Sequence, residues 1–377
     1  MTDEIGPRIR ESIAHRRPRA PEREVAAAVG MSADAFSRAL NGRRAFAAGE
    51  LARLADILEV SVYWLITGHP DPLELRIAAR HVFNFDDRRH EEVDWGQVAQ
   101  RLDDVALAYR QVDADLAPPP PLLPSTAPAL RARLETAGGP AFVHDLAEVI
   151  ERELRIDVIR MPQLDRAYSL RIGIQRAILV NETGNWFHQN WSIAHEVAHL
   201  ILGHATSVGQ SPATAQSVEY EKKANAFAAD LLLPQAVLTA HDWTSMTPPA
   251  VAAFLWDAGV STEALRRRLG SLALPVSARL TALLQNPTQR VLADHLAPRD
   301  ARGSLISERM ARASARRFPP ELIAAHTRAV AVGSVSPATL AWMLDVDPAE
   351  LENELASSVE APGDLDWLAR EFGPGES

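Results

Sequence analysis

The chain has 377 residues, a length that predicts two or three domains, each large enough to bury its own core. Hydrophobic residues make up 47% and charged residues 23% of the chain, which excludes wholesale disorder and a fibrous fold. Cysteine is absent, so any bound metal must be held by His and carboxylate side chains. The sequence also lacks an apolar run of about 18 residues and the apolar core of a signal peptide, so we expect a cytoplasmic protein with no membrane partner.

The net charge of −10 is unevenly distributed along the chain. Between Arg8 and Arg44, nine Arg face four acidic residues, so this N-terminal part alone has the charge to approach a polyanion. The same part shows short stretches with one apolar face, punctuated by Gly or Ser, which predicts a small helical domain over residues 1–70. The expected helices are 8–16, 22–29, 33–40, 48–58 and 62–66.

The segment between the second and third expected helices has the features of a tight helix-helix turn. Gly30 allows the turn and Ser32 is a good N-cap for the next helix. The inner face of the pair would be formed by Ala26, Val29, Phe36 and Leu40. This layout resembles the helix-turn-helix domain of Cro/repressor-type (XRE) regulators.

The resemblance implies that the third expected helix enters the major groove of operator DNA. Asp34 lies on the same exposed face and opposes the approach of phosphate. A helical bundle that docks a protein instead is the alternative. The candidate DNA-contacting residues are Ser32, Ala33, Ser37, Arg38, Asn41, Arg43 and Arg44.

Residues 71–140 are expected to form a helical connector, in which the proline run within residues 117–128 predicts a semi-rigid linker. A helix is expected at about 141–154. Three segments with strand character follow, and we expect them to form a small antiparallel sheet. Nearly everything from Asn190 onward has helical periodicity, so the predicted fold class is mainly α with a small antiparallel β-sheet (α+β). The strand segments are Arg155–Arg160, Tyr168–Ile174 and Arg176–Asn181.

The segment WSIAHEVAHLILGH contains two His four residues apart on a stretch with helical periodicity. His195 and His199 project in the same direction from such a helix, so both imidazoles can ligate one Zn²⁺, and Glu196 lies beside the metal where it can hold a water. The alternative is a structural histidine pair on an amphipathic helix. The apolar residues that give the period are Ile193, Val197, Leu200 and Ile201.

A second candidate helix, in VEYEKKANAFAADLLLP, supports the metal hypothesis. Glu221 offers a carboxylate for the third ligand position, and Asn225, four residues later, could hydrogen-bond a ligating imidazole. Two His and one Glu would leave Zn²⁺ a fourth position for water, as in catalytic sites. Glu196 would then be the general base that moves a proton from water to the leaving amine.

These motifs resemble those of the ImmA/IrrE zinc metallopeptidases. The family shows a strand ending in Asn, a helix with A-H-E-L-G-H, and later E-x-x-A-N-x-F-A-x-x-L-L-x-P; the counterparts are AILVN, NWSIAHEVAHLILGH and EKKANAFAADLLLP. The resemblance covers residues 141–270 and implies one Zn²⁺ per chain, held by His195, His199 and Glu221, with Glu196 as the catalytic residue. It also implies that Arg176–Asn181 is the sheet edge to which a substrate peptide adds.

His204 follows one turn later and is expected to be a surface histidine or one that supports a ligand. Residues 271–377 are predicted to be a helical partner-binding region. Their segment SPATLAWMLDVDPAEL should form two short helices across a turn, too acidic for DNA, with Trp342, Leu344 and Leu351 in the core.

Two functions follow from these resemblances. The preferred one is a DNA-binding transcriptional regulator whose zinc-dependent endopeptidase domain cleaves a regulatory protein such as a repressor, releasing a stress or mobile-element response. The alternative is a type II antitoxin that neutralises a cognate toxin and represses its own operon without proteolysis. The expected partners are operator DNA, through residues 1–70, and a protein substrate or toxin; a homodimer is left open.

Overall fold

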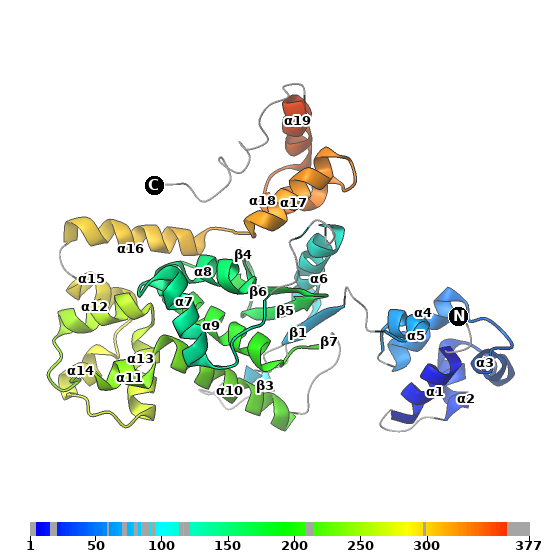
Figure 1. The fold of residues 1–377 in the computed structure, drawn as a ribbon, viewed down its shortest axis with the longest axis horizontal. Helices are drawn as coiled ribbons and strands as arrows, with labels where there is room; N and C mark the ends of the chain where they lie inside the picture. The colour runs from blue at the N-terminus through cyan, green and yellow to red at the C-terminus, as the bar shows by residue number, and fades with distance from the viewer. Residues whose placement is uncertain are drawn as a thin grey trace. The chain divides into compact units, whose positions relative to one another are not determined.

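The computed structural model divides the chain into two compact units, Met1–Glu74 with Ser207–Ser211, and Leu75–Thr206 with Pro212–Ser377. Each unit has its own hydrophobic core. Figure 1 shows the course of the chain within each unit. The residues that the structure describes are 5–15, 21–58, 60–69, 74–78, 82–83, 90–91, 95–112, 116, 121–207, 214–296 and 299–359.

In its described residues the N-terminal unit is a bundle of five short helices, as the periodicity predicted. Their bounds agree with the predicted ones to within about three residues. The helices pack around a core to which each of them contributes apolar side chains. They are α1 (Ile5–His15), α2 (Glu22–Val29), α3 (Ala33–Leu40), α4 (Ala48–Leu58) and α5 (Val62–Thr67).

The turn between α2 and α3 has the predicted chemistry. Gly30 adopts φ 83°, a left-handed conformation in which a glycine is not strained. Ser32 caps α3 by accepting a hydrogen bond from the backbone N–H of Ala35 at 3.2 Å. The predicted inner face is confirmed, since all four of its residues are buried: Ala26, Val29, Phe36 and Leu40.

The second unit is mostly helical and also contains a small β-sheet, which confirms the predicted mainly α fold class with a small sheet. Among the described residues no helix is both long enough and apolar enough to span a membrane. The helices are α6 (Trp95–Val112), α7 (Ala127–Gly138), the 3-10 helix η2 (Phe142–Asp145), α8 (Leu146–Leu154), α9 (Trp186–Leu202), α10 (Thr214–Leu232), α11 (Gln235–Thr239), α12 (Pro248–Ala258), α13 (Thr262–Ser271), α14 (Ala278–Leu283), α15 (Thr288–His295), α16 (Arg299–Ser314), α17 (Pro320–Ala331), α18 (Pro337–Leu344) and α19 (Pro348–Val359).

The main sheet of this unit has the strand order β4-β6-β5-β1-β7. A separate two-stranded pair joins β2 (Val82–Phe83) and β3 (His90–Glu91). In the main sheet β6 runs parallel to β4 and antiparallel to β5, and β5 runs antiparallel to β1. The strands are β1 (Leu75–Ala78), β4 (Asp157–Met161), β5 (Tyr168–Ile172), β6 (Gln175–Asn181) and β7 (Thr206–Ser207).

This topology corrects three expectations. The sheet is mixed rather than antiparallel. The hairpin between β5 and β6 makes only that pair antiparallel, and β4 pairs with the other edge of β6 in the parallel direction. β1 lies where polar helices were expected. Leu75 and Ile77 are buried and Arg76 between them is exposed, but this alternation covers too few residues to predict a strand from the sequence. Finally, β6 is interior and not the expected sheet edge.

The apolar run in β6 is explained by cores on both faces of the sheet. Ile178 and Val180 belong to the core built with α8 and α9, whereas Ala177 and Leu179 belong to the core built with α6, α17 and α18. The C-terminal helices α17 and α18 therefore share a core with α6, although about 200 residues separate them in the sequence.

The two predicted helices of the C-terminal segment are confirmed as α18 and α19. Leu351 is buried, and Trp342 and Leu344 pack against the same core. Of the predicted linker, residues 117–120 lie outside the described part of the chain, and residues 121–126 have no regular structure before α7 begins.

Candidate metal centre

The helix α9 is held at both ends by its sequence. Asn185 caps the N-terminus by accepting a hydrogen bond from the backbone N–H of His188 at 3.2 Å, and Gly203 ends the helix with φ 70°. Most of the helix is buried, since it packs against β6 on one side and α10 on another. Folding therefore places His195, Glu196 and His199 in the interior, each 3% exposed or less.

The helix α10 supplies the second half of the site. Ala224 and Ala228 are fully buried, and their small side chains let α10 approach α9 closely. This approach brings Glu221, 7% exposed, against the two histidines. Asn225 follows one turn later on the same face.

The donor atoms of these three side chains converge on one point. The Nε2 atoms of His195 and His199 lie 3.0 Å apart. The carboxylate oxygens of Glu221 lie 3.2 Å from the first and 3.3 Å from the second. Ligands about 2.05 Å from a tetrahedral ion would lie about 3.3 Å from one another, so the spacing fits a single ion such as Zn²⁺.

The remaining nitrogen of each imidazole also has a partner. His195 Nδ1 lies 3.1 Å from Asn225 Oδ1, so Nδ1–H donates to the amide oxygen and Nε2 faces Glu221. His199 Nδ1 lies 3.0 Å from Nδ1 of His204, whose ring stacks on Tyr220 with centroids 3.9 Å apart. Such partners hold a ligating imidazole in the tautomer and orientation that a metal requires.

Electrostatics agree with this arrangement. Burial and the neighbouring His199 lower the pKa of His204 to about 4, so its ring is neutral and can share one proton with His199. Burial alone would raise the pKa of Glu221, but the hydrogen bonds with His195 and His199 lower it below the usual value for a glutamate. The group therefore presents a carboxylate beside two imidazole nitrogens, the kinds of ligand atom that metal binding needs.

Glu196 differs from its neighbours because one of its oxygens is unsatisfied. The residue is 1% exposed, and Oε2 has no hydrogen-bond partner in the described part of the chain. A buried carboxylate oxygen without a partner carries an energetic cost, which marks it as a position where a water or substrate donor would be favourable.

The structure thus brings together four of the residues proposed for this site, His195, His199, Glu221 and Asn225, and buries the fifth, Glu196, next to His195 in the same helix. His204 was expected at the surface or in a supporting role; it is 6% exposed and contacts His199. The sequence signal for this contact is its position five residues after His199, just beyond Gly203, where the chain turns back toward the helix.

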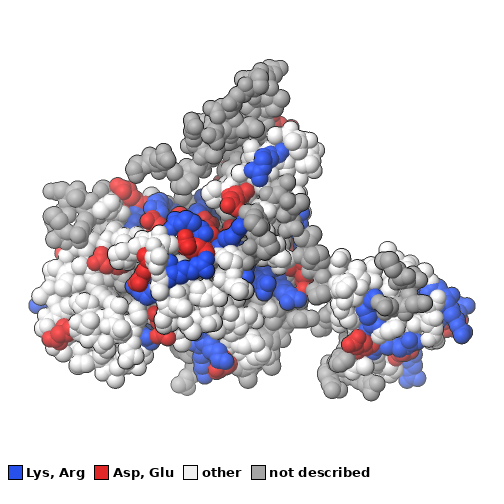
Figure 2. Space-filling view, viewed as in Figure 1, with Lys and Arg blue, Asp and Glu red and all other residues white. Residues whose placement is uncertain are grey.

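The residues proposed for DNA contact lie on and after α3. Ala33, Ser37, Arg38 and Asn41 are exposed, while Ser32 is exposed but serves as the cap of the helix. Figure 2 shows Arg side chains, in blue, at the end of this unit where Figure 1 labels α3.

The basic side chains of this face differ in their partners. Arg38 forms an ion pair with Asp34 at 3.1 Å, and Arg10 donates to the side chain of Asn41. Arg44 makes two hydrogen bonds to Glu50, at 3.0 and 2.8 Å, and the guanidinium lowers the pKa of that carboxyl. Arg43 is exposed and has no side-chain partner among the residues that the structure describes.

One segment of the chain is similar to a known protein family. Residues 151–270 match the family model of the IrrE N-terminal-like domain (Peptidase_M78). No curated protein and no solved structure matches the chain.

The Peptidase_M78 segment runs from the end of α8 to α13 and contains β4, β5, β6, α9 and α10. It therefore includes the His/His/Glu group and both helices that carry it. The match supports a metallopeptidase-type domain over this part of the chain.

Proposed function

We propose that the chain is a zinc-dependent endopeptidase that cleaves a regulatory protein, with His195, His199 and Glu221 as the zinc ligands. The single observation that carries this proposal is the convergence of two imidazole nitrogens and one carboxylate, 3.0 to 3.3 Å apart, beside a buried glutamate with an unsatisfied oxygen. Two nitrogens and one carboxylate in a cysteine-free site suit Zn²⁺ and leave room for a fourth ligand.

When bound, Zn²⁺ would polarise the scissile carbonyl and lower the pKa of water. The roles of this chain's own residues follow from their positions. Glu196 accepts the proton of the attacking water on its unsatisfied oxygen and returns it to the leaving amine. Asn225 and His204 hold the two imidazoles in place and keep their Nε2 lone pairs directed toward the centre.

The proposal extends to the N-terminal unit, which we assign to operator DNA. The support is the predicted turn geometry between α2 and α3, the exposed face of α3 and the excess of Arg over acidic residues between Arg8 and Arg44. A regulator that binds DNA and cleaves a repressor would link a proteolytic event to transcription.

The test replaces Glu196 with Gln, which keeps size and polarity but removes the base. We expect metal content and fold to be unchanged and cleavage of the target to fall by about 10²–10⁴-fold. Glu219→Gln on the exposed face of α10 is the matched control and should cleave like wild type. Cleavage of candidate repressors, derepression in cells and metal content are measured for both variants.

The same variant separates the peptidase from the antitoxin alternative. Toxin neutralisation and operator repression depend on surfaces, whereas Glu196 is buried. If Glu196→Gln supports the cellular response as well as wild type and neutralises a toxin encoded by an adjacent gene, the peptidase proposal is wrong.

A further inference from the structure

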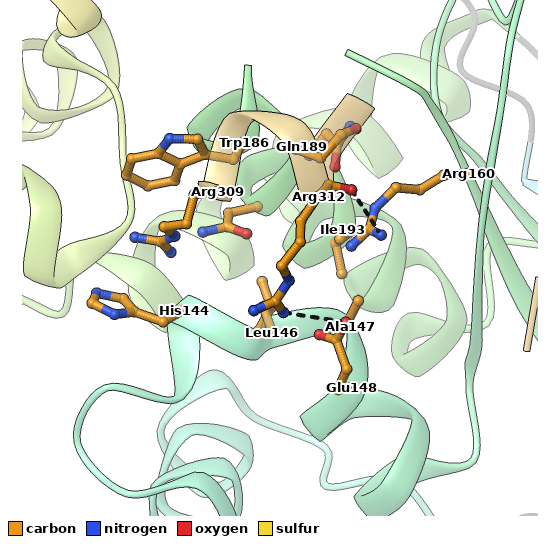
Figure 3. A pocket seen from close by; sticks show the side chains of 12 residues that line it. His144, Leu146, Ala147, Glu148, Arg160, Trp186, Gln189, Ile193, Arg309 and Arg312 are labelled. Carbon is orange, nitrogen blue, oxygen red and sulfur yellow. Dashed lines mark hydrogen bonds and ion pairs between the residues drawn. The ribbon is translucent and has the colours of Figure 1, made fainter. Parts of the chain in front are cut away.

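A second polar cluster of the larger unit lies around a hollow where α8, α9 and α16 meet. The hollow opens to solvent and measures about 370 Å³ with its mouth included. Figure 3 shows the side chains of Arg160, Arg309 and Arg312 around it, with His144 and Trp186 on its walls. Figure 2 shows basic and acidic side chains side by side in the region of α8 and α16.

Two of the three arginines make few hydrogen bonds. Arg160 is 9% exposed; its Nη1 donates to the carbonyl of Arg312 at 3.4 Å, and its Nε has no partner among the described residues. Arg309 donates from Nη2 to the carbonyl of Val143 at 3.3 Å, and its Nη1 is buried without a partner there. Each guanidinium has five N–H donors, so both retain most of their capacity at a site where unpaired donors are costly.

The carboxylates around the hollow are already occupied. Arg312 pairs with Asp145 at 2.8 Å and with Glu148 at 3.5 Å. Within the described part of the chain, neither Arg160 nor Arg309 has an ion-pair partner within 4.0 Å. Burial lowers the pKa of each guanidinium to about 10, against the opposing effect of nearby carboxylates such as Glu148 and Asp145.

The walls of the hollow hold Arg309 in a fixed orientation. Its guanidinium lies over the ring of Trp186, 3.8 Å from the centroid, and 4.7 Å from the centroid of Trp256. Stacking of this kind leaves the N–H edge of the guanidinium available for a planar fork of hydrogen bonds. The side chain is thus oriented before any ligand arrives.

The first turn of α8 also borders the hollow. Leu146, Ala147 and Glu148 line the hollow and are the first three residues of that helix. Its N-cap, Asp145, makes no side-chain capping bond. Backbone N–H groups at a helix N-terminus favour an anion, in agreement with the two unsatisfied arginines.

We propose that this hollow binds a small oxyanion, either free phosphate or the phosphate group of a small metabolite, through Arg160 and Arg309. A phosphate accepts several hydrogen bonds at once, matches the guanidinium fork and supplies the missing negative charge. Trp186, Gln189, Asn190 and Ile193 of the lining belong to α9, on a different face from His195 and His199. The anion site is therefore separate from the metal centre but built on the same helix.

The test measures binding of inorganic phosphate to the full-length protein by calorimetry and by the thermal unfolding midpoint, with sodium chloride at matched ionic strength as reference. A parallel arm uses a nucleoside monophosphate to distinguish a free from a ligand-borne phosphate. Because phosphate can also ligate zinc, both arms are repeated with His195→Ala. We expect saturable binding of one anion per chain in both proteins.

Arg309→Gln should lower the affinity by about tenfold or more, since a charge-assisted fork is lost. Arg266→Gln, an exposed arginine on α13, is the matched control and should bind like wild type. If Arg309→Gln does not fold, Arg309→Lys keeps the charge but loses the fork, and should bind more weakly than wild type. Absence of saturable binding in both arms, or binding that none of the Arg309 variants weakens, would overturn the proposal.

Discussion

The metal centre and the α3 face differ in how their side chains are held. At the metal centre the donor atoms of His195, His199 and Glu221 point at one another, and both histidines have partners on their outer nitrogens. On α3 the candidate side chains are exposed, and several pair with neighbours of their own unit.

Residue spacing determines these two regions to different degrees. A buried group of ligands requires two helices that pack closely, so its geometry is fixed by small and apolar residues as well as by the ligands. An exposed face requires only a helix in the correct register. Its individual side chains take partners that periodicity does not reveal, as Arg44 does with Glu50.

The largest effect is expected when a ligand of the metal centre is removed. His195→Ala and Glu221→Ala each leave two of the three converging groups, so we expect near-complete loss of metal after dialysis. Elemental analysis of purified protein decides this, with His241→Ala, a histidine outside the cluster, as control. Wild-type metal content in either ligand variant would show that the group is not the metal site.

A smaller effect is expected for the two residues that hold the imidazoles. Asn225→Ala and His204→Ala remove the partners of His195 and His199 and should each weaken metal binding by about 10–100-fold. Competition with a chelator of known affinity measures the change. If His204→Ala binds metal like wild type, its contact with His199 is only packing, and the two partners are not equivalent.

Both regions were predictable from the sequence, for different reasons. The metal group was predictable because an i, i+4 histidine pair and a Glu four residues before Asn225 each place side chains on one face of a helix. The bundle α1–α5 was predictable because its apolar periodicity and its Gly and Ser punctuation agree.

The sheet was predictable only in part. Strand segments near β4, β5 and β6 could be located, but not that β4 would pair parallel with β6, because pairing depends on tertiary contacts outside each segment. β1 was missed because four residues, LRIA, carry too little pattern. The arginine hollow was also missed, since it joins Arg160 to residues about 150 positions later in the sequence.

Ser32 was proposed to contact DNA, but in the structure it caps α3, and this structural role can be tested separately. Because its side chain accepts from the N–H of Ala35, Ser32→Ala should destabilise α3 by about 1 kcal/mol, and Ser32→Asp should restore the cap. Amide exchange of α3, followed by mass spectrometry, should be about fivefold faster in the Ala variant. If Ser32→Asp exchanges as fast as Ser32→Ala, the cap does not stabilise α3.

The smallest effect is expected for single arginines of the exposed face, where Arg43 and Arg44 should contribute differently to the salt dependence of DNA binding. Arg43 has no partner in the described residues, whereas Arg44 is already neutralised by Glu50. If both faced DNA equally, each substitution by Ala would reduce the salt dependence of operator binding to the same extent. We expect instead that Arg43→Ala lowers the slope of log affinity against log salt by about 0.9, the value for one phosphate contact, and that Arg44→Ala lowers it less.

Binding of the full-length protein to its own promoter is measured between about 50 and 200 mM salt, a range in which one phosphate contact changes affinity severalfold. Arg290→Ala on α15, exposed and outside the N-terminal unit, is the control and should leave the slope unchanged. Equal slopes for wild type and Arg43→Ala would remove Arg43 from the interface. Promoter binding that does not depend on salt would contradict the assignment of the whole unit to DNA, since exposed arginines bind phosphates by releasing counterions.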